Sequence, residues 1–125
     1  MSKEERLKLA NEFIVVIASC GRKFFEHNGI ISTLELSKGG RVYFIDCHTK
    51  IRIYTHHRTM TWAGFSGNHT MKHLVDSLRD FIISGVPMKA EYFKLEMDRK
   101  LKKPWGYGED ILILHDTAIK LGIAR

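Results

Sequence analysis

The spacing of the apolar residues changes once, near residue 30, and this change constrains the fold more than any other feature of the sequence. Over residues 3–27 apolar side chains recur every three or four positions, which places them on one stripe of a helix. From Ile30 they alternate with polar residues, the pattern of a strand buried on one face. The sequence therefore predicts one long helix followed by an antiparallel sheet.

The ends of the long helix are marked by residues with capping roles. Ser2 and Glu5 have the spacing of a capping box, in which a hydroxyl and a carboxylate satisfy free amides at a helix start. Asn28 and Gly29 tolerate the left-handed conformation that ends many helices. We therefore expect a helix from about Lys3 to His27.

A meander of three strands is predicted over residues 30–36, 41–47 and 50–57, with turns at residues 38–40 and 48–49. If the second turn has two residues, Cys47 lies opposite Lys50 and Tyr43 lies opposite Tyr54. This register separates a mainly aliphatic face from an aromatic and basic face, which is how register is normally specified. Residues 60–66 predict a fourth strand.

Two C-terminal helices complete the predicted fold, one from Asn68 or Thr70 to Gly85 and one from Glu109 to Leu121. The charged residues 89–103 fit either a further helix or an exposed arm. The order predicts a single α+β domain over residues 1–125. Its three- to four-stranded antiparallel meander would have the N-terminal helix and the two C-terminal helices packed on one face.

Composition limits the cell compartment and the class of partner. No apolar run reaches the ~18–20 residues that span a bilayer, and the N-terminus lacks a signal-peptide core, so we expect a cytoplasmic protein and no membrane partner. Cys20 and Cys47 are too few and too far apart for a disulfide framework, and we expect reduced thiols. The net charge of +6 favours a polyanion as partner.

The sheet face that needs no helical cover carries aromatic and basic side chains side by side. Cations bind phosphates, and aromatic rings stack on bases with ~1–3 kcal/mol per base. The predicted nucleic-acid-binding residues are Arg41, Tyr43, Lys50, Arg52, Tyr54, His56 and Arg58. The same face also fits an ordinary solvated strand surface or a protein interface.

Two further segments have charge or backbone features that suit phosphate. A turn ahead of the second helix offers small residues and free amides at Gly64, Ser66, Gly67 and Thr70, although a plain strand-to-helix turn needs the same residues. A second basic patch consists of Arg99, Lys100, Lys102 and Lys103. This patch fits a solvated surface, an arm along a nucleic-acid backbone, or the rim of a protein interface.

Motifs for metal binding and catalysis are weak or missing. His69 and His73 lie one helical turn apart, followed by Asp76, but a third assured ligand is lacking, so they remain weak candidates and no metal site is predicted. The sequence has no nucleophile elbow, no P-loop and no paired-carboxylate motif. We expect a protein that is not an enzyme and has no cofactor.

Four stretches resemble small uncharacterised proteins of tailed bacteriophages: Arg52-Ile-Tyr-Thr-His56, Trp62-Ala-Gly-Phe-Ser66, Leu78-Arg-Asp-Phe-Ile82 and Trp105-Gly-Tyr-Gly-Glu-Asp110. This resemblance implies an accessory protein working in the host cytoplasm, and it brings no assigned activity. The order of elements from Arg41 is similar to sheet-reading DNA-binding domains of the plant ethylene-response type, which implies DNA in preference to RNA.

The hypothesis favoured by these observations is nucleic-acid binding through the aromatic and basic sheet face. One alternative is an inhibitor or adaptor that docks the same face on an acidic surface of a host protein, for counter-defence or host take-over. Another is a nucleotide-binding sponge that uses this face with the Gly64–Thr70 turn. A free strand edge would also permit a homodimer.

Overall fold

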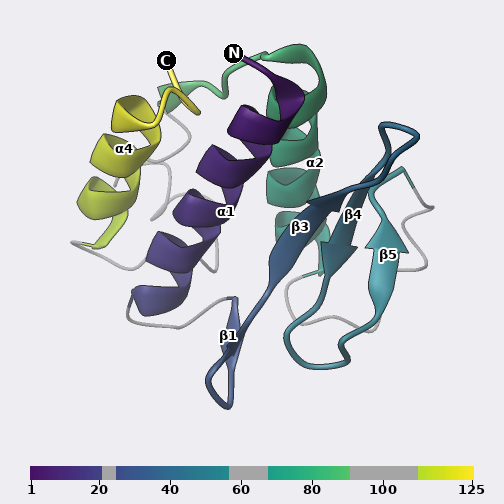
Figure 1. Ribbon diagram of the computed structural model, residues 1–125. Helices are drawn as coiled ribbons and strands as arrows, with labels where there is room; N and C mark the ends of the chain where they lie inside the picture. The colour runs from purple at the N-terminus through teal and green to yellow at the C-terminus, as the bar shows by residue number, and fades with distance from the viewer. Residues whose placement is uncertain (21–24, 57–67, 91–109) are drawn as a thin grey trace.

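The computed structural model describes residues 1–20, 25–56, 68–90 and 110–125, and it has the predicted α+β class (Figure 1). The elements in chain order are α1 (Lys3–Ser19), β1 (Glu26–His27), β2 (Ile30–Ile31), β3 (Thr33–Leu36), β4 (Val42–Ile45), β5 (Arg52–Tyr54), α2 (Asn68–Ser84) and α4 (Asp110–Lys120). No helix in the described ranges is long and apolar enough to cross a membrane.

The main sheet has the antiparallel order β3-β4-β5, and β1 pairs with β2 in a separate hairpin. One face of the main sheet is apolar: Leu34, Val42, Phe44 and Ile53 are buried and join the core formed with the helices. In Figure 1, α1 lies between α4 and the sheet, with α2 behind it. This arrangement leaves the opposite face of the sheet without cover from α1, α2 or α4.

The start of α1 follows the prediction more closely than its end. The Ser2 Oγ accepts a hydrogen bond from the Glu5 amide at 3.1 Å, whereas the Glu5 carboxylate accepts from the Ser2 hydroxyl at 3.3 Å rather than from the Ser2 amide. The helix ends at Ser19, because Cys20 is extended at φ −82° and ψ 167°. The predicted continuation of the helix to His27 is therefore wrong.

Asn28 and Gly29 form the turn of the β1–β2 hairpin instead of a helix stop. His27 pairs with Ile30 across them, and both turn residues have positive φ, 51° and 80°. An Asn-Gly pair suits a two-residue hairpin turn as well as a helix end, because both need the left-handed conformation. The local sequence therefore fitted both structures.

The single strand predicted over residues 30–36 is wrong, because it is divided into β2, which pairs with β1, and β3 of the main sheet. The other helix and strand boundaries agree with the sequence prediction to within a few residues, apart from those on residues that the structure does not describe. Gly85 and Gly122 follow α2 and α4 with φ of 72° and 76°, the conformation expected of residues that end helices. The strands β4 and β5 are shorter than predicted. The predicted strand at 60–66 and most of the charged segment 89–103 lie outside the described residues.

Asn11 of α1 attaches the helix to the sheet through its side-chain amide. Its Nδ2 donates to the Leu34 carbonyl at 3.0 Å, and its Oδ1 accepts from the Leu34 amide at 2.8 Å. The Asn11 side chain thus forms hydrogen bonds with both backbone groups of Leu34 at the outer edge of β3. A second chain therefore cannot pair with the strand at this position.

Candidate nucleic-acid interface

The pairing of β4 with β5 determines which side chains share the outer face of the sheet. Tyr43 pairs with Tyr54, Phe44 with Ile53, and Ile45 with Arg52, as the sequence predicted. Since successive side chains of a strand point to opposite faces, burial of Phe44 and Ile53 places both tyrosines on the other side. The predicted register is confirmed.

The side chains on this outer face contact one another. The ring centroids of Tyr43 and Tyr54 are 5.5 Å apart. The guanidinium carbon of Arg52 lies 3.7 Å from the Tyr43 centroid, and that of Arg41 lies 5.2 Å from the Tyr54 centroid. The His56 ring meets Tyr54 edge-on at 5.3 Å. These five residues, Arg41, Tyr43, Arg52, Tyr54 and His56, are called here the aromatic-basic face.

Burial differs between the rings and the cations of the aromatic-basic face. Tyr43 and Tyr54 are half-buried, whereas Arg41, Arg52 and His56 are exposed. A solvent-exposed cation over an aromatic ring gains about 0.5–1 kcal/mol, which restricts the motion of the guanidinium groups without neutralising them. The face therefore presents oriented cations to solvent, with aromatic surface beneath them.

Glu35 belongs to the same surface, and the sequence analysis missed it. It pairs with Tyr43 across β3 and β4, and its Oε2 accepts a hydrogen bond from the Arg52 Nε at 3.1 Å. Both side chains of this ion pair are 50% exposed. The pair reduces the positive charge of the face and fixes the position of Arg52. The pairing of Glu35 with Tyr43 in the register of β3 against β4 could have revealed that Glu35 belongs to this surface.

The turn between β4 and β5 differs from the predicted two-residue turn. Lys50 donates its amide proton to the Asp46 carbonyl at 2.9 Å, while the Asp46 amide donates to the Ile51 carbonyl at 3.2 Å. Lys50 and Ile51 therefore both oppose Asp46, as in a β-bulge, and Lys50 takes a left-handed φ of 61°. Cys47 does not face Lys50, so that part of the prediction is wrong.

The carboxylate of Asp46 explains why the chain turns in this way. Its Oδ2 accepts hydrogen bonds from the amides of His48 and Thr49 at 3.0 and 2.8 Å, and from the Thr49 hydroxyl at 3.1 Å. These bonds stabilise a turn over residues 47–49, because they satisfy amides that the strands cannot pair. The exposed Lys50 follows this turn.

Several predicted site residues lie outside the described part of the chain. They are Arg58, the turn residues Gly64, Ser66 and Gly67, and the second basic patch Arg99, Lys100, Lys102 and Lys103. Thr70 falls in the first turn of α2, which begins at Asn68. The third strand needed for the likeness to the plant DNA-binding domains also falls on residues that the structure does not describe.

The weak metal candidates His69 and His73 both lie on α2, where His73 is exposed. The nearby Asp76 carboxylate is 3.0 Å from the Lys72 ammonium and 2.9 Å from the Arg79 guanidinium. Because two cations already neutralise Asp76, it is a poor third ligand for a metal ion.

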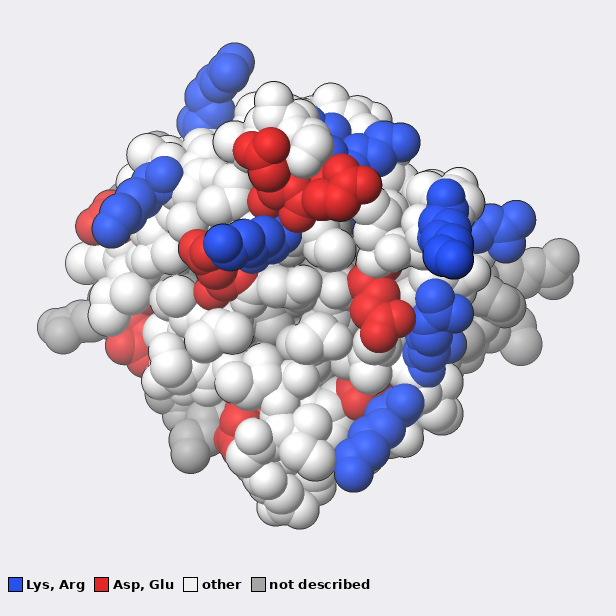
Figure 2. Space-filling model, viewed as in Figure 1, with Lys and Arg blue, Asp and Glu red and all other residues white. Residues whose placement is uncertain are grey.

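Basic and acidic side chains lie close together on the part of the surface that Figure 2 shows. Figure 2 shows Lys and Arg side chains along the side of the molecule that the sheet occupies in Figure 1, with acidic side chains among and beside them. The basic residues of the hairpin, Arg41, Lys50 and Arg52, are all exposed. This surface can attract an anionic partner, although Glu35 makes its charge mixed.

Comparison with known proteins assigns the chain to a family. A family model described as YoqU matches residues 1–122. The chain belongs to the YoqU family. No curated protein and no solved structure matches it.

Proposed function

We propose that this member of the YoqU family is a non-enzymatic, phage-type accessory protein that binds nucleic acid through the aromatic-basic face, in the host cytoplasm. The observation that carries the proposal is the adjacency of Tyr43 and Tyr54 with a guanidinium group beside each ring. The resemblance to tailed-phage proteins supports the phage-type assignment. The net charge of +6 supports a polyanionic partner.

The cations of the face suit phosphate groups. The ion pair of Arg52 with Glu35 uses the Nε of the guanidinium, so its two terminal nitrogens can donate to a phosphate. Arg41, directly before β4, and Lys50, at the β4–β5 turn, are both exposed and add charges at opposite ends of the hairpin. Such contacts give affinity that falls as salt concentration rises, because counterions are released on binding.

The rings of the face suit unpaired bases. Arg52 lies close enough to Tyr43 for its planar group to stack on the ring, and the outer side of a guanidinium can itself stack on a base. A column of ring, guanidinium and base would then form on the sheet. Unpaired bases are available in single strands, so we expect single-stranded DNA or RNA to bind more tightly than a duplex.

A second candidate function, inhibition or adaptation of a host protein, is favoured by the Glu35–Arg52 pair. An acid beside the cations of a polyanion-binding surface opposes binding, whereas mixed charges around half-buried tyrosines are common in protein interfaces. The nucleotide-sponge alternative depends in part on the Gly64–Thr70 turn, most of which is not described, and no observation favours it over these two.

The test is a fluorescence-anisotropy titration of labelled single-stranded DNA, single-stranded RNA and duplex DNA over a range of salt concentrations. Affinity for a single strand that decreases linearly with salt on logarithmic axes supports the proposal. Arg41→Ala and Arg52→Ala should both weaken binding. Lys8→Ala, which removes one exposed positive charge from α1, is the control and should change it little.

Absence of salt-dependent affinity for all three nucleic acids would overturn the proposal. In that case a nuclease-treated pull-down from bacterial lysate tests the second candidate. A protein partner that the wild-type chain retains and the Arg52→Ala variant loses would favour an inhibitor or adaptor that uses the same face.

A further inference from the structure

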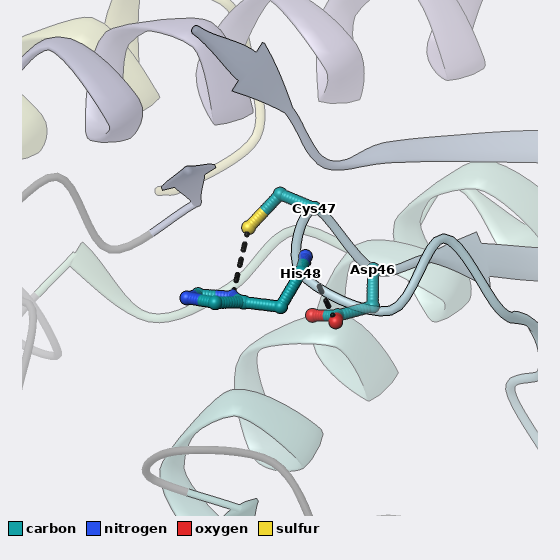
Figure 3. A group of neighbouring side chains, drawn as sticks. All are labelled: Asp46, Cys47 and His48. Atoms are coloured by element: carbon teal, nitrogen blue, oxygen red, sulfur yellow. Dashed lines mark hydrogen bonds between the residues drawn. The ribbon is translucent and has the colours of Figure 1, made fainter. Parts of the chain in front are cut away.

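The β4–β5 turn brings three side chains of different ligand types together, away from the tyrosines of the aromatic-basic face. One carboxylate oxygen of Asp46, the Sγ of Cys47 and one imidazole nitrogen of His48 all lie within 4.8 Å of one another. Figure 3 shows the Cys47 thiol directed at the His48 ring, while the Asp46 carboxylate accepts a hydrogen bond from the His48 amide. We propose that Asp46, Cys47 and His48 form a binding site for a zinc ion.

The distance between the sulfur and the imidazole supports this site. The Sγ of Cys47 is 3.4 Å from the Nδ1 of His48. Zinc–sulfur bonds of about 2.3 Å and zinc–nitrogen bonds of about 2.0–2.1 Å, at tetrahedral angles, place the two ligand atoms about 3.5 Å apart. The Cys47–His48 pair is therefore already near the separation that a shared zinc ion requires.

The carboxylate of Asp46 offers a third ligand atom. All three hydrogen bonds of this side chain go to Oδ2, and no donor among the described residues bonds Oδ1. Asp46 is only 2% exposed, and a buried carboxylate oxygen without a hydrogen bond is costly. A cation bound at Oδ1 would satisfy this atom while the three turn hydrogen bonds remain in place.

The electrostatic surroundings of the thiol favour a cation. The carboxylates of Asp46 and Glu26 both act electrostatically on the Cys47 thiol. The carboxylates that disfavour a thiolate alone would stabilise a divalent cation beside it. On binding, the thiol transfers its proton to the buffer and the sulfur becomes a thiolate ligand.

A neighbouring histidine ring and access from solvent also favour a metal ion at this turn. The His27 ring stacks on the His48 ring with centroids 4.2 Å apart, which holds the imidazole plane from the β1–β2 hairpin. His48 is exposed, so an ion can reach the turn from solvent. Water would occupy the fourth position of the zinc ion. The donor set of one sulfur, one nitrogen and one oxygen favours zinc over magnesium or calcium.

The test is zinc binding by the metal-free full chain, measured by competition with a chromophoric chelator. We expect one zinc ion per chain and no competition from excess magnesium. His48→Ala changes an exposed side chain and should leave the fold intact, yet it should weaken zinc binding at least tenfold, since even loss of an outer partner of a metal ligand costs about 10–100-fold. Cys47→Ser should weaken it as well.

Two matched controls separate this site from adventitious binding. Cys20→Ser alters the other free, buried cysteine, and His115→Ala removes a half-buried histidine of α4; both variants should bind zinc like the wild type. The proposal is overturned if the wild type binds no zinc, or if His48→Ala, shown to be folded by circular dichroism, binds it with unchanged affinity.

Discussion

The guanidinium of Arg52 contacts two residues of β3 and β4 at once: it stacks over the ring of Tyr43, and its Nε donates to Glu35. These contacts have opposite consequences for an anionic partner. The ring keeps the cation in place without reducing its charge, whereas the carboxylate neutralises part of that charge. The balance between them can be measured with single substitutions.

Glu35→Gln should strengthen single-strand binding, because it removes the negative charge beside Arg52 and leaves a side chain of the same size. An exposed ion pair contributes about 0–1 kcal/mol to the free energy of unfolding, so stability should change little. The dissociation constant from anisotropy titration and the urea midpoint measure the two effects. Weaker nucleic-acid binding in a fully folded Glu35→Gln variant would contradict a polyanion-binding face and favour the protein-interface alternative.

Tyr54→Phe should bind a single strand nearly as well as the wild type, whereas Tyr54→Leu should lose about 1–3 kcal/mol of binding free energy. The reason is that stacking on a base requires the ring but not the hydroxyl. Both variants keep an apolar side chain at a half-buried position, and their circular dichroism spectra should match. Equal affinities of the two variants would show that the ring does not stack on bases.

Lys50→Gly should raise the free energy of unfolding by about 0.5–1 kcal/mol. A left-handed residue other than Gly costs about 1–2 kcal/mol, and the greater freedom of Gly in the unfolded chain offsets part of the gain. If Lys50 contacts a phosphate, the slope of the salt dependence should also decrease by about one. Urea unfolding measures the stability, and Lys50→Ala, which keeps the strained φ, is the matched control.

Asn11→Ala should lower the free energy of unfolding by about 1–3 kcal/mol. The substitution removes two hydrogen bonds and leaves the amide and the carbonyl of Leu34 without their partner on α1. Ser19→Ala removes one exposed hydrogen bond from the same helix and should cost well under half as much. If the variants are equally stable, water replaces the Asn11 amide at the edge of β3 without penalty.

The arrangement of the outer sheet face could be predicted from the sequence because alternation and register are short-range properties. Tyr43 and Tyr54 are paired by the same pattern that buries Phe44 and Ile53, and a one-residue slip would expose both of the latter. The contribution of Glu35 was missed because it comes from a third strand, and its contact with Arg52 depends on the pairing of β3 with β4.

At two places the predicted local conformation is wrong, and the physical reason is the same. Asn28-Gly29 is compatible with a helix stop and with a hairpin turn, and pairing of Glu26 and His27 with β2 determines which one forms. Likewise, the turn after β4 follows from three hydrogen bonds to the buried Asp46 carboxylate, which a count of turn residues does not reveal. In both places longer-range pairing or a side-chain acceptor decided between conformations that the local sequence permits.

The thiols should make the protein less stable at alkaline pH. Burial raises the pKa of both Cys20 and Cys47 above the ordinary value of 9.0, with smaller contributions from Asp110 near Cys20 and from Asp46 and Glu26 near Cys47. Because the unfolded chain then loses thiol protons at lower pH than the folded chain, the stabilising effect is complete below about pH 9 and is lost as pH rises through the folded-state values. The free energy of unfolding from urea titrations at a series of pH values across this range measures the effect.

Other groups titrate in the same range, so the comparison must be made with a variant that lacks the thiols. The Cys20→Ser/Cys47→Ser protein should lose less stability than the wild type over the same interval, because serine does not ionise there. Metal-free buffer keeps zinc from deprotonating Cys47. Parallel pH profiles of the two folded proteins would show that the thiols are no harder to ionise in the folded chain than in the unfolded one.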